Sequence, residues 1–208
     1  LSLPQLPRRF ALISASKAAG YGDFMDHLHN NPYGFSFYTK LYSAPMQGDS
    51  APGGIIEQLD NIWGDVQKGD HFDAVMILRG GGAVSDLICF DDYELASHCA
   101  QFPLPILSGI GHTRDMSIVD MVTYTSVKTP TAAAEWLIER VAEQVERVNQ
   151  LEVRLQRATQ YAVVQENNKL QAYLQRMSYS AQRLIMQEQN KLQMWGKTIE
   201  LHSPERIF

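Results

Sequence analysis

The chain has 208 residues, of which 45% are hydrophobic and 20% charged, and its formal net charge is −5. This composition can fill a sizeable core, and it excludes a disordered chain. The sequence contains no run of 18 or more apolar residues and no signal-peptide pattern at its start, so we expect neither a membrane span nor secretion. Its two cysteines, Cys89 and Cys99, lack a metal-binding spacing, and we expect a cytoplasmic location.

The first part of the chain, residues 1–130, alternates between strand-like and helix-like segments. The strand-like segments are apolar or aromatic runs at 10–13, 35–42, 73–78 and 105–110. Helical patterns follow the first three of them, at 18–29, 53–66 and 91–100. Such alternation predicts an α/β domain, with an open, mainly parallel sheet of about four strands and helices on both faces.

The composition changes near residue 130. Residues 1–130 carry 8 Lys and Arg and 14 Asp and Glu, about −6, whereas residues 131–208 carry 10 and 9, about +1. Only one proline and one glycine follow residue 130. We therefore predict two domains: an α/β domain at 1–130 and a long helical segment at 131–208.

Apolar or small residues recur in the second segment at spacings of three and four, which is the pattern of a coiled coil. The polar stretch 165–169 interrupts this pattern and is compatible with a hairpin turn or with a polar layer in one continuous helix. We expect this segment to serve in assembly rather than in direct contact with nucleic acid.

Arg79 directly follows the apolar run 73–78 and is followed by Gly80, Gly81 and Gly82. Ligands of an open parallel sheet bind beyond the carboxyl ends of its strands. Glycine amides can approach a phosphate closely and a guanidinium binds two of its oxygens, so this segment predicts a phosphate cradle, with a tight turn as the alternative. Motifs for nucleotide hydrolysis and for dinucleotide binding are absent from the sequence.

Other polar residues follow the first and last predicted strands of the sheet. Ser14 and Ser16 come after the first strand, and we assign their hydroxyls to the same phosphate. His112 and Asp115 come after the last strand, three residues apart, where the carboxylate could orient the imidazole for proton transfer. An exposed histidine with no role in catalysis is the alternative. The residues alone thus predict an enzyme that binds a phosphate or carboxylate.

Three motifs occur in a fixed order between residues 76 and 135. They are Arg-Gly-Gly-Gly at 79–82, Gly-His-x-x-Asp at 111–115 and Thr-Pro-Thr-Ala-Ala-Ala-Glu at 129–135. In this combination the chain resembles the catalytic region of the exonuclease VII large subunit, and its helical segment resembles that family's as well. The resemblance implies an exodeoxyribonuclease that degrades single-stranded DNA from both ends into oligonucleotides. It also implies several copies of a small helical subunit on residues 131–208, and no required metal or other cofactor.

The family's functional residues fall on Asp23, Arg79, His112 and Asp115 of this chain. In our hypothesis, Arg79 and the loop amides bind the scissile phosphate, and His112 is the general acid or base. Asp115 would orient His112, and Asp23 would position the attacking water or carry a second proton.

The chain departs from the family pattern at two positions, where Ser85 and Thr113 replace carboxylates that the family carries. The part played by Asp86 is left open. If the enzyme required magnesium, Asp23, Asp86 and Asp115 would be the expected ligands.

The family also carries an N-terminal OB-fold domain that binds single strands, and the resemblance finds no counterpart of it here. We therefore expect this chain to be a piece of a longer protein, with weak or no activity by itself. Two alternatives stay open: an enzyme that binds a small anion such as a phosphosugar or nucleotide, and a non-catalytic assembly module.

Overall fold

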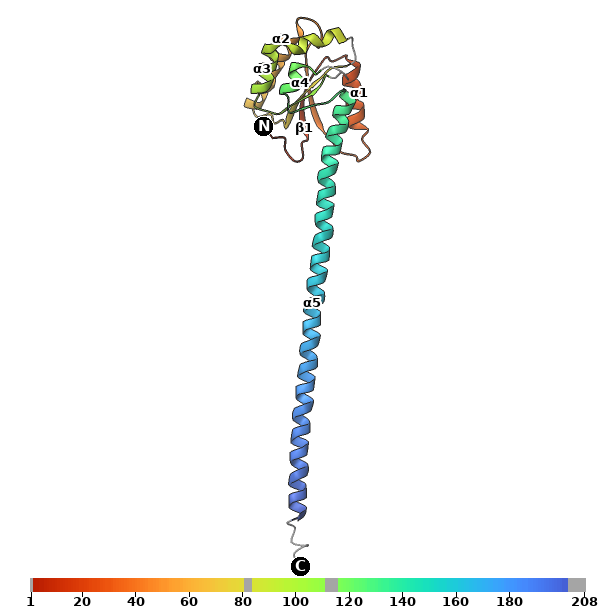
Figure 1. The fold of residues 1–208 in the computed structure, drawn as a ribbon, viewed down its shortest axis with the longest axis vertical. Coiled ribbons are helices and arrows are strands. Elements are labelled where there is room, and N and C mark those ends of the chain that lie inside the picture. The colour runs from red at the N-terminus through yellow and green to blue at the C-terminus, as the bar shows by residue number, and fades with distance from the viewer. Residues whose placement is uncertain (1, 81–83, 111–115, 202–208) are drawn as a thin grey trace, which may run out of the picture. The chain divides into compact units, whose positions relative to one another are not determined.

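The computed structural model describes residues 2–80, 84–110 and 116–201 (Figure 1). The chain divides into two compact units, Leu1–Val148 and Asn149–Phe208. The division falls within the last helix, whereas the change in composition at residue 130 coincides with the beginning of that helix.

The first unit is built on a sheet of five parallel strands in the order β2-β1-β3-β4-β5. The strands are β1 (Arg9–Ser14), β2 (Tyr38–Ser43), β3 (Ala74–Leu78), β4 (Ile106–Gly109) and β5 (Thr125–Ser126). The predicted α/β class with an open parallel sheet is confirmed. The fifth strand was not expected, because two residues are too few to give a hydrophobic pattern.

Helices connect the strands and cover the sheet (Figure 1). They are α1 (Ala19–His29), α2 (Ala51–Gln67), the 3-10 helix η1 (Val84–Asp91), α3 (Tyr93–Gln101), α4 (Ile118–Val122) and α5 (Pro130–Leu201). Their ends follow local chemistry: the Asp92 carboxylate accepts a hydrogen bond from Leu95 N at 2.8 Å and starts α3. After α2, Gly69 adopts a φ of 109°, which a residue with a side chain rarely does.

Two apolar clusters lie on opposite faces of the sheet, because successive side chains of a strand point to opposite sides. On one face, Ala11 and Ile13 of β1 pack with residues of α2 and α3 such as Leu59 and Leu95. On the other face, Phe10 and Leu12 pack with α1 and with the first turns of α5. The prediction of helices on both faces is therefore confirmed.

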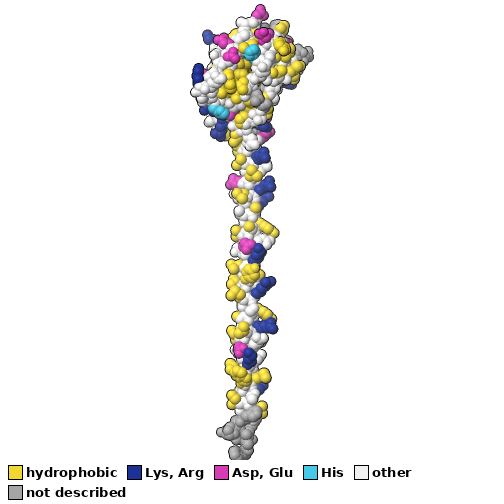
Figure 2. Space-filling model, turned by 90° about the vertical axis from the view of Figure 1, so that its left-hand side faces the viewer, with side chains coloured by type: hydrophobic (Ala, Val, Ile, Leu, Met, Phe, Trp, Pro, Cys, Tyr) yellow, Lys and Arg dark blue, Asp and Glu magenta, His cyan; other side chains and the backbone are white. Residues whose placement is uncertain are grey.

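Helix α5 runs without interruption from Pro130 to Leu201 and passes through residues 165–169, so the hairpin alternative is excluded. Its buried residues all lie in the first four turns: Ala133, Ala134, Leu137, Ile138 and Val141. From residue 149 to 201 every side chain is exposed, and Figure 2 shows apolar side chains along this part of the helix. No helix in the described part of the chain is long and apolar enough to cross a membrane.

Candidate functional site

The strand order places a topological switch point between β1 and β3. The chain leaves β1 for β2 on one side, and then returns past β1 to form β3 on its other side. Connections that diverge in this way leave a crevice beyond the carboxyl ends of the two strands, where open parallel sheets bind their ligands. The carboxyl ends of β1 and β3 are therefore the place to look for a site.

A cleft of about 440 Å³ opens at this point. Its walls come from the segments that follow β1, β2 and β3: Ala15, Lys17, Ala18, Ala19, Pro45, Met46, Gln47, Arg79 and Gly80. The polar side chains among them are those of Lys17, Gln47 and Arg79, and the described residues of the lining include no carboxylate. The lining is thus cationic and suits an anion.

Arg79 is only 3% exposed, although it lines the cleft. Its backbone N–H donates to the Gly109 carbonyl oxygen at 3.1 Å, which joins the end of β3 to the end of β4. A guanidinium in a largely dehydrated position acts strongly on a nearby anion, because little water screens its charge.

The Arg79 segment packs directly against the beginning of α1 through two glycines. A Cβ added to Gly20 would meet Gly80 Cα at 2.5 Å, and one added to Gly80 would meet Gly20 N at 2.8 Å. Only glycine at both positions permits this approach. The N-cap of α1 is Ala18, whose side chain cannot accept a hydrogen bond, so α1 begins without a side-chain cap, and both Ala18 and Ala19 line the cleft.

A second hollow at the same edge of the sheet, about 470 Å³, has the opposite charge. Its lining includes the carboxylates Asp49, Asp91 and Asp92. Two of them already accept backbone hydrogen bonds, Asp91 from Ile118 N at 3.0 Å and Asp92 from the start of α3. Of the two hollows, the cleft at Arg79 is the one that suits a phosphate.

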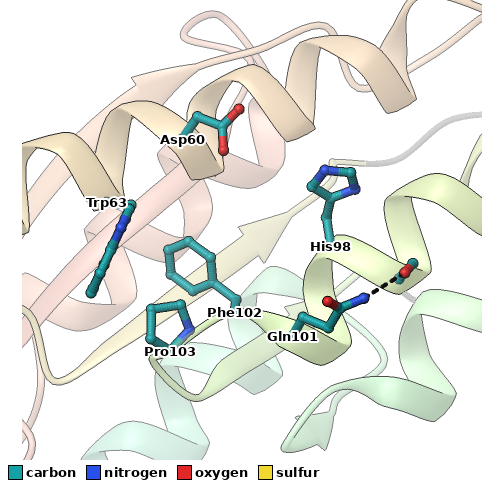
Figure 3. A pocket seen from close by; sticks show the side chains of 7 residues that line it. Asp60, Trp63, His98, Gln101, Phe102 and Pro103 are labelled. Carbon is teal, nitrogen blue, oxygen red and sulfur yellow. Dashed lines mark hydrogen bonds between the residues drawn. The ribbon is translucent and has the colours of Figure 1, made fainter.

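A third hollow of about 310 Å³ lies between α2 and α3 (Figure 3). Asp60 and Trp63 of α2 stand opposite His98, with Phe102 and Pro103 beside the Trp63 ring (Figure 3). Asp60, Trp63 and His98 belong to the second halves of α2 and α3, which run toward the amino ends of β3 and β4, and Phe102 and Pro103 directly follow α3. The hollow is therefore near the other edge of the sheet from the Arg79 cleft.

The family model for exonuclease VII, large subunit, matches residues 1–207. The chain belongs to the exonuclease VII large-subunit family. Among its relatives, an exodeoxyribonuclease 7 large subunit of Nostoc sp. is 32% identical over 177 residues, which are 85% of this chain and 41% of that protein. One of Lactobacillus helveticus is 30% identical over 81% of this chain and 36% of its own length. The matches thus span about a third to two fifths of the length of these relatives.

The structure brings only part of the family's expected site residues together. Arg79 and Gly80 line the cleft, whereas Asp23 is exposed on α1 and is not among the lining residues. Ser16 is exposed. Ser14 is fully buried, and its hydroxyl donates to the Leu78 carbonyl oxygen at 2.7 Å, so its hydrogen already serves the link between β1 and β3.

The other predicted residues of the exonuclease VII site lie outside the described part of the chain. These are Gly81, Gly82, His112 and Asp115, together with Thr113 and the side chains of Ser85 and Asp86. Among residues 2–80, 84–110 and 116–201, no group of three or more His, Cys, Asp or Glu side chains is placed to hold a metal ion.

Sequence reasoning missed several residues of the site. Lys17 lies next to Ser16 in the turn after β1, and this position after a predicted strand could have identified it as a residue of the cleft. Gln47 reaches the cleft because β2 lies beside β1, a neighbourhood that the sequence does not reveal. Gly20 is the partner of Gly80, and a glycine inside a helical pattern was its only sign.

Proposed function

We propose that this chain is the catalytic part of an exodeoxyribonuclease that hydrolyses phosphodiester bonds of single-stranded DNA. The observation that carries the proposal is the buried Arg79, which lines a cleft at the switch point of the sheet whose described lining includes no carboxylate. Family membership agrees with it, because the relatives are named exodeoxyribonuclease 7 large subunit.

In this proposal, Arg79 binds the scissile phosphate in the cleft, and its planar fork contacts two phosphate oxygens. Gly80 and the uncapped amides of α1 supply further N–H donors at short range. As water attacks phosphorus, negative charge grows on the equatorial oxygens. Donors that are already oriented toward that charge lower the barrier without reorganisation.

We assign the proton transfers to residues that were expected from the resemblance to the exonuclease VII large subunit. His112 takes the proton of the attacking water, or gives one to the sugar oxygen that leaves as the phosphorus–oxygen bond breaks. Asp115 holds His112 in the productive orientation, and Asp23 positions the water. No step in this scheme uses a metal ion or another cofactor.

The assembly is also part of the proposal. Several copies of a small helical subunit cover the exposed apolar side chains of α5, such as Leu170 at 55% and Leu184 at 63% exposure. Burial of such a seam against partner helices is the ordinary source of coiled-coil stability. The enzyme acts in the cytoplasm and degrades its substrate from both ends into oligonucleotides.

The test is a digest of end-labelled single-stranded DNA in EDTA. It uses the longest natural polypeptide that contains this chain, purified with the subunits that accompany it, beside the variants Arg79→Ala and His112→Ala. His98→Ala is the matched control, because His98 lies in the hollow of Figure 3. We expect cleavage by the parent and by the control, and its loss in the other two variants. The isolated 208-residue chain should cleave weakly or not at all.

Other outcomes would redirect the proposal. Cleavage that appears only after magnesium is restored would assign Asp23, Asp86 and Asp115 to a metal site. Absence of cleavage in both conditions, with a melting temperature raised by a sugar phosphate, would favour an enzyme acting on a small anion. Biological activity that survives both substitutions would favour an assembly module.

A further inference from the structure

Asp120 of α4 is a buried carboxylate at the carboxyl edge of the sheet, 9% exposed. Its Oδ1 accepts hydrogen bonds from Ser108 Oγ at 2.5 Å and Ser126 Oγ at 2.9 Å. Its Oδ2 accepts from Ser117 Oγ at 2.8 Å and from Ser117 N at 3.2 Å. The described residues thus supply three hydroxyls and one amide, which satisfy both oxygens of the carboxylate.

These partners come from three separate pieces of the chain. Ser108 belongs to β4, Ser126 to β5, and Ser117 is the N-cap of α4. In the sequence, Ser108 precedes and Ser117 follows the segment 111–115, so one carboxylate holds the residues on both sides of that segment. Hydrogen bonds to a charged acceptor are stronger than those between neutral groups, which makes the junction rigid.

The same junction reaches the phosphate cleft. Ser108 is followed by Gly109, whose carbonyl oxygen accepts the backbone N–H of Arg79. A shift of Ser108 would therefore move the end of β4 on which the Arg79 backbone rests.

We infer that Asp120 is a positioning residue for the reaction proposed above, an inference that rests on that proposed function. Its carboxylate holds Ser108 and Ser117, which flank in sequence the segment that carries His112 and Asp115, and through Ser108 it holds the end of β4 behind Arg79. It takes no part in bond making or proton transfer. A neutral amide at this position has a single acceptor oxygen, so it cannot hold both sides of the junction in the same way.

The chain offers a matched control at the opposite edge of the sheet. Asp73 has an 11% exposed side chain, and its Oδ2 accepts from Arg8 N at 2.7 Å and Arg9 N at 2.9 Å. Asp73 therefore ties the beginning of β1 to the beginning of β3, as Asp120 ties the ends of β4 and β5. None of the candidate site residues that the structure describes lies at that edge.

The experiment compares Asp120→Asn with Asp73→Asn in the complete, naturally assembled enzyme. Thermal melting and the kcat and KM for end-labelled single-stranded DNA are measured for each variant. We expect both variants to melt at a lower temperature. For Asp120→Asn, kcat should fall by about tenfold to a hundredfold, the size of effect that a small misplacement of reacting groups causes, while KM changes little. For Asp73→Asn, kcat should stay at the parent value.

If Asp120→Asn does not assemble, a second pair of variants tests whether Asp120 is a positioning residue. Ser117→Ala removes one hydroxyl donor and should lower kcat, whereas Ser117→Thr keeps the hydroxyl and should restore it. Unchanged kcat in Asp120→Asn, or in Ser117→Ala, would overturn the inference while leaving the proposed function intact. Equal losses of kcat in Asp120→Asn and Asp73→Asn would also overturn it, since the effect would then be loss of stability alone. A parent enzyme that cleaves no DNA would remove the proposed function and this inference together.

Discussion

At the amino edge of the sheet, polar groups bind one another, whereas at the carboxyl edge cationic groups line an open cleft. Asp73 holds the first residues of β1, and Lys40 Nζ lies 2.9 Å from both Asp65 Oδ2 and Asp70 Oδ2. At the other edge, Arg79 and Lys17 face a cleft of about 440 Å³. The amino edge is thus closed by ion pairs and hydrogen bonds, whereas the carboxyl edge combines a hydrogen-bonded junction at Asp120 with an open cleft.

This difference between the two edges predicts which substitutions change the stability of the fold and which change its activity. In a parallel sheet the connections that carry ligand sites all leave from the carboxyl ends. The amino edge can be closed with ion pairs and side-chain bonds to the backbone at no cost to binding. Substitutions at the amino edge should therefore change the free energy of unfolding, and those at the carboxyl edge should change the rate of cleavage.

The largest expected effect is that of Arg79→Ala on cleavage of single-stranded DNA. Loss of a preorganised donor to the transition state typically lowers kcat by about 10²–10³. The matched substitution is Arg9→Ala at the amino edge, where the guanidinium lies 4.4 Å from the Tyr38 ring centroid and Nε donates to the His71 carbonyl oxygen at 2.7 Å. Arg9→Ala should lower the melting temperature slightly and leave kcat unchanged. Equal kcat values for the two variants would contradict the comparison.

Next in size is the effect of Gly20→Ala. The new methyl group would meet Gly80 Cα at 2.5 Å and Pro130 Cγ at 2.9 Å, so α1 or the Arg79 segment must move. We expect a loss of about 1–3 kcal/mol in the free energy of unfolding, measured by urea denaturation, and a fall in kcat.

Gly22→Ala is the control for Gly20→Ala in the same helix, because a Cβ at Gly22 has nothing within 4 Å among the described residues. It should raise the free energy of unfolding by roughly 0.5–1 kcal/mol, since alanine favours the helix over glycine. A loss of stability in Gly22→Ala as large as that in Gly20→Ala would show that the glycine contact is not the cause.

Most of the fold could be predicted because its signals are local. The run 73–78 contains the fully buried strand β3, and residues 131–195, which include no glycine or proline, all lie in the single helix α5. The order of the strands could not be predicted, because it depends on how the connections cross the sheet and not on any one segment. Strand β5 has two residues and is defined by its pairing with β4, which the local sequence does not indicate.

The candidate site could be predicted only in part, for the same reason. Arg79 was found because it directly follows a buried strand, which is a local signal. Ser14 also follows a strand pattern, but whether its hydroxyl faces a ligand or the Leu78 carbonyl depends on the neighbouring strand. Within the Asp120 junction, Ser117 and Asp120 have the spacing of a capping box, but Ser108 and Ser126 lie 18 positions apart and no spacing motif indicates their bonds to Asp120.

A smaller effect is expected from pH on the cluster of Lys40, Tyr42 and Asp65. Burial and the hydrogen bond that its hydroxyl donates to Asp65 Oδ2 at 2.7 Å raise the pKa of Tyr42 from 10.0 to about 12. The bonds from Tyr42 and Lys40 lower the pKa of Asp65 below 3.8. The contribution of Tyr42 is therefore complete below pH 10 and lost as the pH rises toward about 12, whereas that of Asp65 is present above pH 3.8 and lost in stronger acid.

Tyr42→Phe checks the alkaline half of this expectation. It removes one hydrogen bond and should lower the free energy of unfolding at neutral pH by about 1 kcal/mol. Urea denaturation between pH 9 and 12 should then show a shallower decline of stability than in the parent, because the variant no longer holds the phenol proton in the folded state. If the variant and the parent lose stability equally between pH 9 and 12, titration of groups other than Tyr42 causes that loss. The kcat at neutral pH should not change, because none of Lys40, Tyr42 and Asp65 lines the cleft.

The smallest effect is expected from Lys17→Gln, which removes one positive charge from the rim of the Arg79 cleft. If Lys17 contacts a phosphate of the bound strand, KM should rise several-fold at constant kcat. The slope of log KM against log salt concentration should then fall by about 1, because one counterion fewer is displaced on binding. Asp60→Asn makes the opposite change of charge in the hollow of Figure 3 and should leave both KM and this slope unaltered. Changes of the salt slope that are equal in size and opposite in sign in the two variants would mean that net charge alone governs DNA binding, and that the two edges of the sheet do not differ in this respect.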